Sequence, residues 1–148
     1  ILDNGLKTKC NELVASCIAM KGALVAEDEF DRGVRELLNF GHTFGHAIEA
    51  LSHYEISHGH AVAIGMHLAG KTAAKLGLCE NSASREITSA LTSLGFSLEC
   101  PYPMDELYRI MLQDKKRRGE TIDLILPYAV GDCRIYPVQI NDLKKILL

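Results

Sequence analysis

Four residues able to bind a metal ion or an anion are spaced to share one face of a helix. They are Arg35, followed four, seven and eleven positions later by Asn39, His42 and His46. An α-helix brings residues at these offsets into a narrow arc. Imidazole binds metal ions and guanidinium binds carboxylate or phosphate, whereas a helix that packs only for stability would carry apolar groups there. The spacing predicts a site for a metal ion and a small anionic ligand, and Glu49 and His53 extend the same stripe.

All six histidines fall between His42 and His67, so metal binding is the sharpest form of this prediction. Two neutral imidazoles with one carboxylate are a common catalytic zinc set, and His42 with either His46 or His58 could supply the imidazoles. The run from His42 to His46 has the spacing of a metalloprotease helix but lacks the glutamate that serves as general base, which argues against a peptidase. A buried polar network would explain one histidine; two beside an arginine and an asparagine favour a site.

Hydrophobic periodicity predicts the elements that would position these residues. Helices are expected from about Leu6 to Leu24 and over Val34–Ser52, Gly59–Leu76, Ser82 or Ser84 to Leu94, Met104–Leu112 and from Asn141 onward. Strands are expected over Thr121–Pro127 and Arg134–Val138, joined by a turn at Val130–Cys133. The expected fold class is therefore mainly α, with one small β-hairpin near the C-terminus, and residues 1–148 are expected to form a single domain. Gly41 and Gly45 beside the polar stripe would let another backbone or a ligand come close.

Composition narrows the partners that the chain can have. The net charge of -3 gives no general attraction for nucleic acid or membrane lipid, so an anionic ligand must be held by local basic groups. Five widely spaced cysteines argue against a disulfide framework and a thiolate zinc site, and buried or functionally indifferent thiols are expected. No apolar run approaches the roughly 20 residues that cross a bilayer, and a cytoplasmic location is expected.

Several motifs together resemble one enzyme family. Leu37-Leu-Asn-Phe-Gly-His-Thr-Phe-Gly-His-Ala-Ile-Glu49, Ser57-His-Gly59, Asp114-Lys-Lys116 and Leu124-Ile-Leu-Pro127 resemble 3-dehydroquinate synthase, and the likeness extends over nearly the whole chain. It implies the C-terminal, largely helical domain of an enzyme whose N-terminal NAD-binding domain is absent from this chain. The implied reaction belongs to the shikimate pathway and converts the keto acid phosphate DAHP to 3-dehydroquinate and phosphate, through transient oxidation by NAD, metal-assisted phosphate elimination and aldol closure.

The same resemblance implies a role for particular residues. His42 and His58 match the two histidine ligands of a divalent metal ion, zinc or cobalt, whose third ligand is a glutamate upstream of the first helix. Substrate contacts are implied for Lys21, Arg35, Asn39 and His46, and one of Lys115 and Lys116 matches a lysine near the phosphate. We hypothesise that His46 also helps to move a proton there. The full-length enzyme is expected to be a homodimer, and the chain alone to bind metal weakly and to be inactive.

One departure from the family and three alternatives remain open. His60 stands where the family usually has an acidic residue; it could tune His58, add a ligand in the isolated domain, or be a neutral surface substitution. The alternatives are another sugar phosphate cyclase of the 2-deoxy-scyllo-inosose synthase type, a metal-dependent alcohol dehydrogenase relative, and a non-catalytic helical metal-binding module. Glucose 6-phosphate, the substrate of the rival cyclase, has no carboxylate, so the pairing of Lys21 and Arg35 favours the keto acid.

Overall fold

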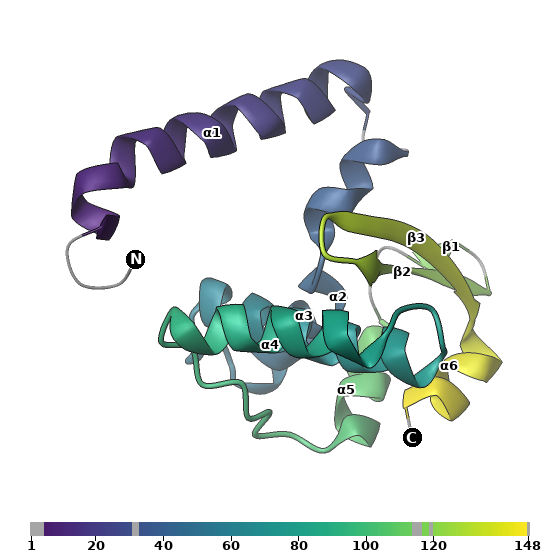
Figure 1. Ribbon diagram of the computed structural model, residues 1–148. Coiled ribbons are helices and arrows are strands. Elements are labelled where there is room, and N and C mark those ends of the chain that lie inside the picture. The colour runs from purple at the N-terminus through teal and green to yellow at the C-terminus, as the bar shows by residue number, and fades with distance from the viewer. Residues whose placement is uncertain (1–4, 31–32, 114–116, 119, 148) are drawn as a thin grey trace. The chain divides into compact units, whose positions relative to one another are not determined.

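The computed structural model describes residues 5–30, 33–113, 117–118 and 120–147 (Figure 1). Its backbone contacts divide the chain into two compact units, Ile1–Leu38 and Asn39–Leu148, and each is described by itself. The expectation of a single domain therefore stays a prediction. No helix in the described part of the chain is both long and apolar enough to cross a membrane.

The first unit consists mainly of the long helix α1 (Gly5–Glu27), followed by all but the last residue of the 3-10 helix η1 (Val34–Asn39). Large apolar side chains of α1 are exposed, among them Leu13, Val14, Ile18 and Met20. The carboxylate of Asp28 accepts hydrogen bonds from the backbone N–H groups of Gly33 at 2.8 Å and Arg35 at 3.2 Å. This contact satisfies two donors at the start of η1 that have no partner within the helix.

The second unit carries the remaining helices: α2 (His42–Leu51), α3 (His58–Lys75), α4 (Asn81–Ser93), α5 (Met104–Met111) and α6 (Ile140–Leu147). The expected helices are confirmed here to within a few residues at their ends, except for the one expected over Val34–Ser52. The five cysteines are free thiols, as expected: Cys10, Cys17, Cys79, Cys100 and Cys133. The expectation that the thiols are buried is wrong for Cys10 and Cys17, which are exposed on α1.

The expectation of one continuous helix over Val34–Ser52 is wrong. The segment is a 3-10 helix up to Asn39, and α2 begins only at His42, after Gly41 adopts a left-handed backbone with φ of 80°. A side chain at Gly41 would meet the backbone nitrogen of Met66 at 2.7 Å, so the bend is built around a close approach of α3. The arc of an ideal α-helix therefore applies within α2, and Arg35 and Asn39 belong to the separate helix η1.

The sheet is antiparallel, in the order β1 (Arg117–Arg118), β2 (Thr121–Ala129), β3 (Asp132–Gln139). The expected hairpin between β2 and β3 is confirmed, and Gly131 at its turn has the positive φ of 86° that such turns require. The two-residue strand β1 was not expected, since the basic residues there suggested a solvated loop.

The core lies between α2, α3, α5, α6 and the central strand. Its largest fully buried side chains include Phe44, Ile48, Leu107, Met111, Ile122, Leu124, Leu126 and Leu143. Six consecutive residues of β2, from Ile122 to Pro127, are buried, where the sequence suggested alternation. Burial of consecutive residues means that both faces of this strand are covered, because successive side chains point to opposite faces.

Candidate functional site

Close packing between α2 and α3 creates the framework of the site. A side chain at Gly65 of α3 would overlap the carbonyl oxygen of Gly41, and a Cβ at Gly45 would lie 3.1 Å from the Cα of Val62. The expectation that Gly41 and Gly45 allow a close approach is confirmed, and what approaches is the backbone of α3. Only helices without side chains at the contact can come this near, so the glycines set how close the residues on α2 and α3 can be.

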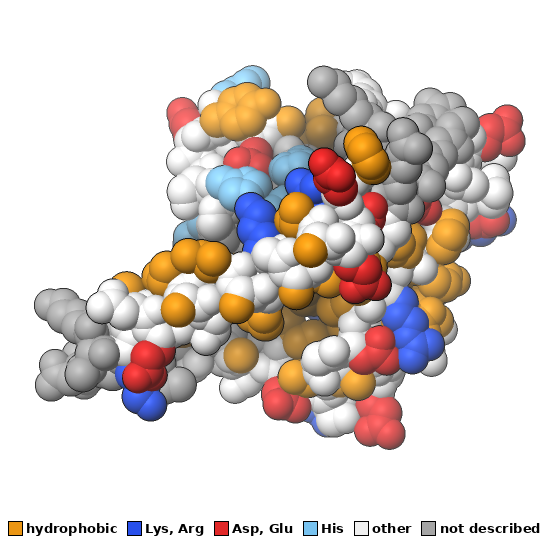
Figure 2. All heavy atoms as spheres, turned by 90° about the horizontal axis from the view of Figure 1, so that it is seen from above, with side chains coloured by type: hydrophobic (Ala, Val, Ile, Leu, Met, Phe, Trp, Pro, Cys, Tyr) orange, Lys and Arg blue, Asp and Glu red, His pale blue; other side chains and the backbone are white. Residues whose placement is uncertain are grey.

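Three imidazole rings gather at this helix pair. The ring of His42 lies 5.4 Å from that of His46 and 5.2 Å from that of His58, measured between centroids, and the His46 and His58 rings are 6.0 Å apart. His46 and His58 are exposed and His42 is half-buried. Figure 2 shows histidine side chains grouped on one face of the molecule next to an acidic side chain. The structure thus brings together three of the histidines that the sequence singled out.

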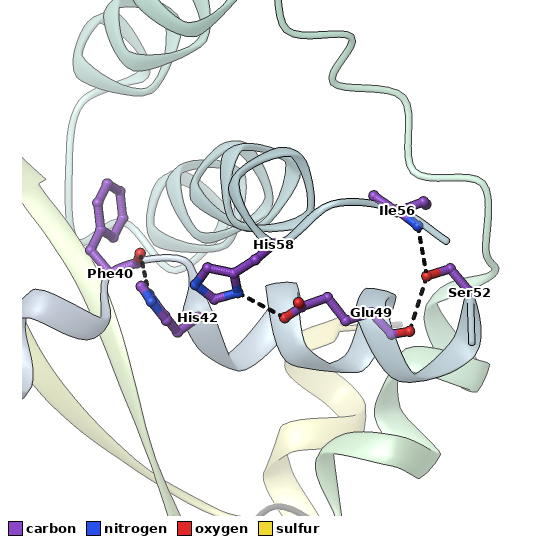
Figure 3. Close-up of polar contacts among 6 residues, drawn as sticks. All are labelled: Phe40, His42, Glu49, Ser52, Ile56 and His58. Carbon is purple, nitrogen blue, oxygen red and sulfur yellow. Dashed lines mark hydrogen bonds and ion pairs between the residues drawn. The ribbon is translucent and has the colours of Figure 1, made fainter. Parts of the chain in front are cut away.

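The connection between α2 and α3 holds His58 in this position (Figure 3). The buried hydroxyl of Ser52 donates to the carbonyl oxygen of Glu49 at 3.0 Å and accepts from the N–H of Ile56 at 3.3 Å. His53 and Tyr54 adopt left-handed backbones with φ of 50° and 65°. Such conformations are uncommon for residues other than glycine and persist where the surrounding structure fixes them, so the path to His58 is closely determined.

Hydrogen bonds define the tautomers of two of these rings. The Nδ1 of His58 lies 3.0 Å from Oε2 of Glu49, and the Nδ1 of His42 lies 3.3 Å from the carbonyl oxygen of Phe40. A carbonyl or carboxylate oxygen only accepts, so in a neutral ring Nδ1 carries the hydrogen and Nε2 carries the lone pair. Metal-binding histidines have this arrangement, with one nitrogen donating to the protein and the other facing the ion.

The donor atoms suit a divalent metal ion. Ligand atoms of His46, Glu49 and His58 all lie within 4.8 Å of one another, and His42 stands beside them. Imidazole nitrogen and carboxylate oxygen are the ligands found in catalytic zinc sites. Glu49 was not assigned a role from the sequence, although it lies three residues after His46 on the same helical stripe, a signal that could have identified it.

The remaining residues predicted for the site belong to the first unit, to the first position of the second unit, or to the part of the chain outside the described residues. Arg35, in the first unit, donates from Nη1 to the carbonyl oxygen of Glu29 at 2.7 Å, and Lys21 is exposed on α1. Asn39, half-buried at the end of η1, is the first residue of the second unit. Lys115 and Lys116 lie outside the described residues. Their expected contacts with substrate stay predictions.

His60 makes a contact that the sequence did not suggest. Its Nε2 lies 2.9 Å from the carbonyl oxygen of Ser97, and its ring meets the ring of Phe96 edge-on at 5.6 Å between centroids. The imidazole thereby joins the first turn of α3 to the connection that precedes α5. It is not part of the metal-ligand group formed by His46, Glu49 and His58.

Comparison with solved structures places the fold among NAD- and metal-binding cyclases. The chain matches 2-deoxy-scyllo-inosose synthase complexed with carbaglucose-6-phosphate, NAD+ and Co2+ with a TM-score of 0.75 and 26% identity, covering 88% of this chain and 39% of that one. It has the same fold as part of the 2-epi-5-epi-valiolone synthase from Streptomyces hygroscopicus with NAD+ and Zn2+ bound, with a TM-score of 0.70 and 23% identity, covering 84% and 35%.

Sequence comparison identifies the family. Residues 2–117 match the 3-dehydroquinate synthase C-terminal family, and the chain belongs to it. It is 40% identical over 138 residues to a 3-dehydroquinate synthase of Streptococcus pneumoniae, and 38% identical to that of another strain. In each case the match covers 92% of this chain and 39% of the relative, so the chain spans about two fifths of the length of these relatives.

Proposed function

We propose that the chain forms the metal- and substrate-binding part of a 3-dehydroquinate synthase, which converts DAHP to 3-dehydroquinate and phosphate. The observation that carries this proposal is the group of three imidazoles and one carboxylate on α2 and at the start of α3, in a chain of that family. Identity of 40% to a 3-dehydroquinate synthase favours this activity over those of the more distant cyclases.

His42 and His58 would hold the metal ion. Both have Nδ1 beside an oxygen that can only accept, so both can present a lone pair at Nε2. When bound, a zinc or cobalt ion supplies Lewis-acid polarisation of substrate oxygens. The match covers 39% of the relatives' length, and both a third ligand and most of the NAD site would come from the remaining part of a full-length enzyme.

The chain's other polar groups would bind and orient the substrate. Lys21, Arg35 and one of Lys115 and Lys116 supply cations for a ligand that bears a carboxylate and a phosphate, and Asn39 supplies an amide. The exposed imidazole of His46 would carry a proton near the phosphate, and a His46→Ala enzyme with unchanged turnover would remove that role. A homodimer and a cytoplasmic location remain predictions for the full-length enzyme.

The direct test is an assay of the chain joined to the NAD-binding part of the Streptococcus pneumoniae relative. We expect the joined protein to release phosphate from DAHP in the presence of NAD and Zn2+ or Co2+, and the chain alone to release none. His42→Ala in the joined protein should abolish turnover. Turnover by the chain alone would contradict the proposal, as would an inactive joined protein when the intact relative, assayed alongside, is active.

A second candidate is cyclisation of glucose 6-phosphate. The TM-score of 0.75 to 2-deoxy-scyllo-inosose synthase, solved with carbaglucose-6-phosphate, favours it. The joined protein can be assayed with this sugar phosphate under the same conditions. Turnover of glucose 6-phosphate without turnover of DAHP would establish the second candidate. Metal binding without turnover of either substrate would point to a non-catalytic module.

A further inference from the structure

We propose that Glu49 is a positioning residue for His58: its carboxylate accepts the Nδ1 hydrogen and so presents Nε2 to the metal ion. This inference rests on the metal site of the proposed function and adds a residue that the sequence did not assign. It differs from a direct ligand role, which the proximity of Glu49, His46 and His58 would also allow.

The geometry of the pair favours positioning. Oε2 of Glu49 lies 3.0 Å from Nδ1 of His58, and the two side chains are 12% and 56% exposed. A carboxylate with so little exposure needs a partner, because its charge is otherwise poorly solvated. Figure 3 shows the other ring nitrogen of His58 on the side of the ring that faces His42. The hydrogen bond therefore turns the ring so that Nε2 and the neighbouring histidine lie on the same side.

The backbone around the pair restrains both partners. Ser52 donates to the carbonyl oxygen of Glu49 itself and accepts from Ile56, two residues before His58. Ser52 is 5% exposed, so these hydrogen bonds face little competition from water. The connection between α2 and α3 thus sets the distance between Glu49 and His58, and the backbone is already in place when their hydrogen bond forms.

The first experiment tests the hydrogen bond without any metal. Long-range 1H–15N NMR spectra of the imidazoles, recorded at pH 8, distinguish hydrogen on Nδ1 from hydrogen on Nε2. We expect hydrogen on Nδ1 of His58 in the wild-type chain and a shift towards Nε2 in Glu49→Ala. Glu49→Gln, which keeps an accepting oxygen, should keep the wild-type tautomer. Glu55→Gln is the matched control, since it removes an exposed carboxylate from the same connection.

An unchanged His58 tautomer in Glu49→Ala would overturn the inference, as would a wild-type ring with its hydrogen on Nε2. Because the spectra are recorded without metal, this result does not depend on whether the chain binds an ion. Thermal unfolding of each variant checks that the fold is intact.

The second experiment measures the consequence for metal binding. Titration with Co2+, followed by visible absorption, should give an affinity about 10- to 100-fold weaker for Glu49→Ala than for wild type, with Glu55→Gln unchanged. At saturation the spectra of Glu49→Ala and wild type should coincide, because the ligands are the same. A changed spectrum would make Glu49 a ligand and overturn the positioning role. A wild-type chain that binds no Co2+ would overturn the proposed metal site, and the role of Glu49 with it.

Discussion

Helix α3 packs against two helices in contrasting ways. Towards α2 it presents Gly65 and His58, and towards α4 it presents Gly70 and His67. At Gly65 a Cβ would overlap the backbone of Gly41, whereas at Gly70 it would lie 3.3 Å from the hydroxyl oxygen of Ser84. Backbone meets backbone on one side, and on the other a side chain stands between the helices.

The histidines on these two sides of α3, His58 and His67, also differ in their surroundings. His58 is exposed, donates to a carboxylate and stands among other imidazoles, while half-buried His67 donates through Nδ1 to the hydroxyl oxygen of Thr88 at 2.9 Å. Thr88 in turn donates to the carbonyl oxygen of Ser84, so the His67 hydrogen bond joins α3 to α4. The surroundings of a histidine on one helix thus decide whether it serves packing or binding.

Glycine substitutions should give the largest difference in the free energy of unfolding between the face of α3 towards α2 and the face towards α4. Gly65→Ala forces a Cβ into the Gly41 carbonyl and should lower the free energy of unfolding by about 3 kcal/mol or more. Gly70→Ala meets only a side-chain hydroxyl, and its cost is offset by the higher helix propensity of alanine, so a change below about 1 kcal/mol is expected. Urea denaturation followed by circular dichroism measures both values.

Gly59→Ala is the matched control for these variants, because a Cβ there has nothing within 4 Å. It should be neutral or stabilise the protein by up to about 1 kcal/mol. Equal losses in Gly65→Ala and Gly70→Ala would remove the distinction between the two faces of α3.

A smaller effect on the free energy of unfolding should come from His67, on the side of α3 that faces α4, as the pH falls. Burial, and to a lesser extent the charge of Lys71, lower the pKa of His67 below its usual 6.5. Below pH 6.5 the unfolded chain therefore binds a proton at His67 more readily than the folded chain does. The contribution of His67 to the free energy of unfolding is fully present above pH 6.5 and is lost as the pH falls towards the folded-state pKa. The loss from one such group is at most about 1.4 kcal/mol per pH unit.

The measurement compares unfolding free energies at pH 8 and pH 5.5 in wild type and His67→Gln. The variant should lose less stability than wild type across this interval, since it has no imidazole to protonate at this position. If both proteins lose the same amount, His67 does not contribute to the acid sensitivity.

Sequence periodicity was sufficient for most of the fold because the helices of the second unit and the hairpin have local signals. The bend at Gly41 could not be predicted, since it depends on Gly65 of another helix packing against it. Likewise, the continuous burial of β2 depends on elements that cover both of its faces, and the two-residue strand β1 is too short to leave a periodic pattern.

The candidate site was only partly predictable from the sequence. His42 and His46 lie close together because one helix carries both, which periodicity captures. His58 reaches them through a connection with two left-handed residues, whose path no repeat encodes. The sequence pattern left His46 and His58 open as the partner of His42, and the family resemblance chose His58. Glu49 was visible on the stripe, but its role depends on that same path.

The zinc affinity of His42→Ala distinguishes the proposed ligand pair, His42 and His58, from the neighbouring group of His46, Glu49 and His58. Calorimetric titration of the chain should show a loss beyond the roughly 100-fold upper bound expected for a residue that only orients a ligand. His53→Asn, which removes an exposed imidazole and tolerates the left-handed backbone, should bind as wild type does. Wild-type zinc affinity in His42→Ala would show that His42 is not a metal ligand.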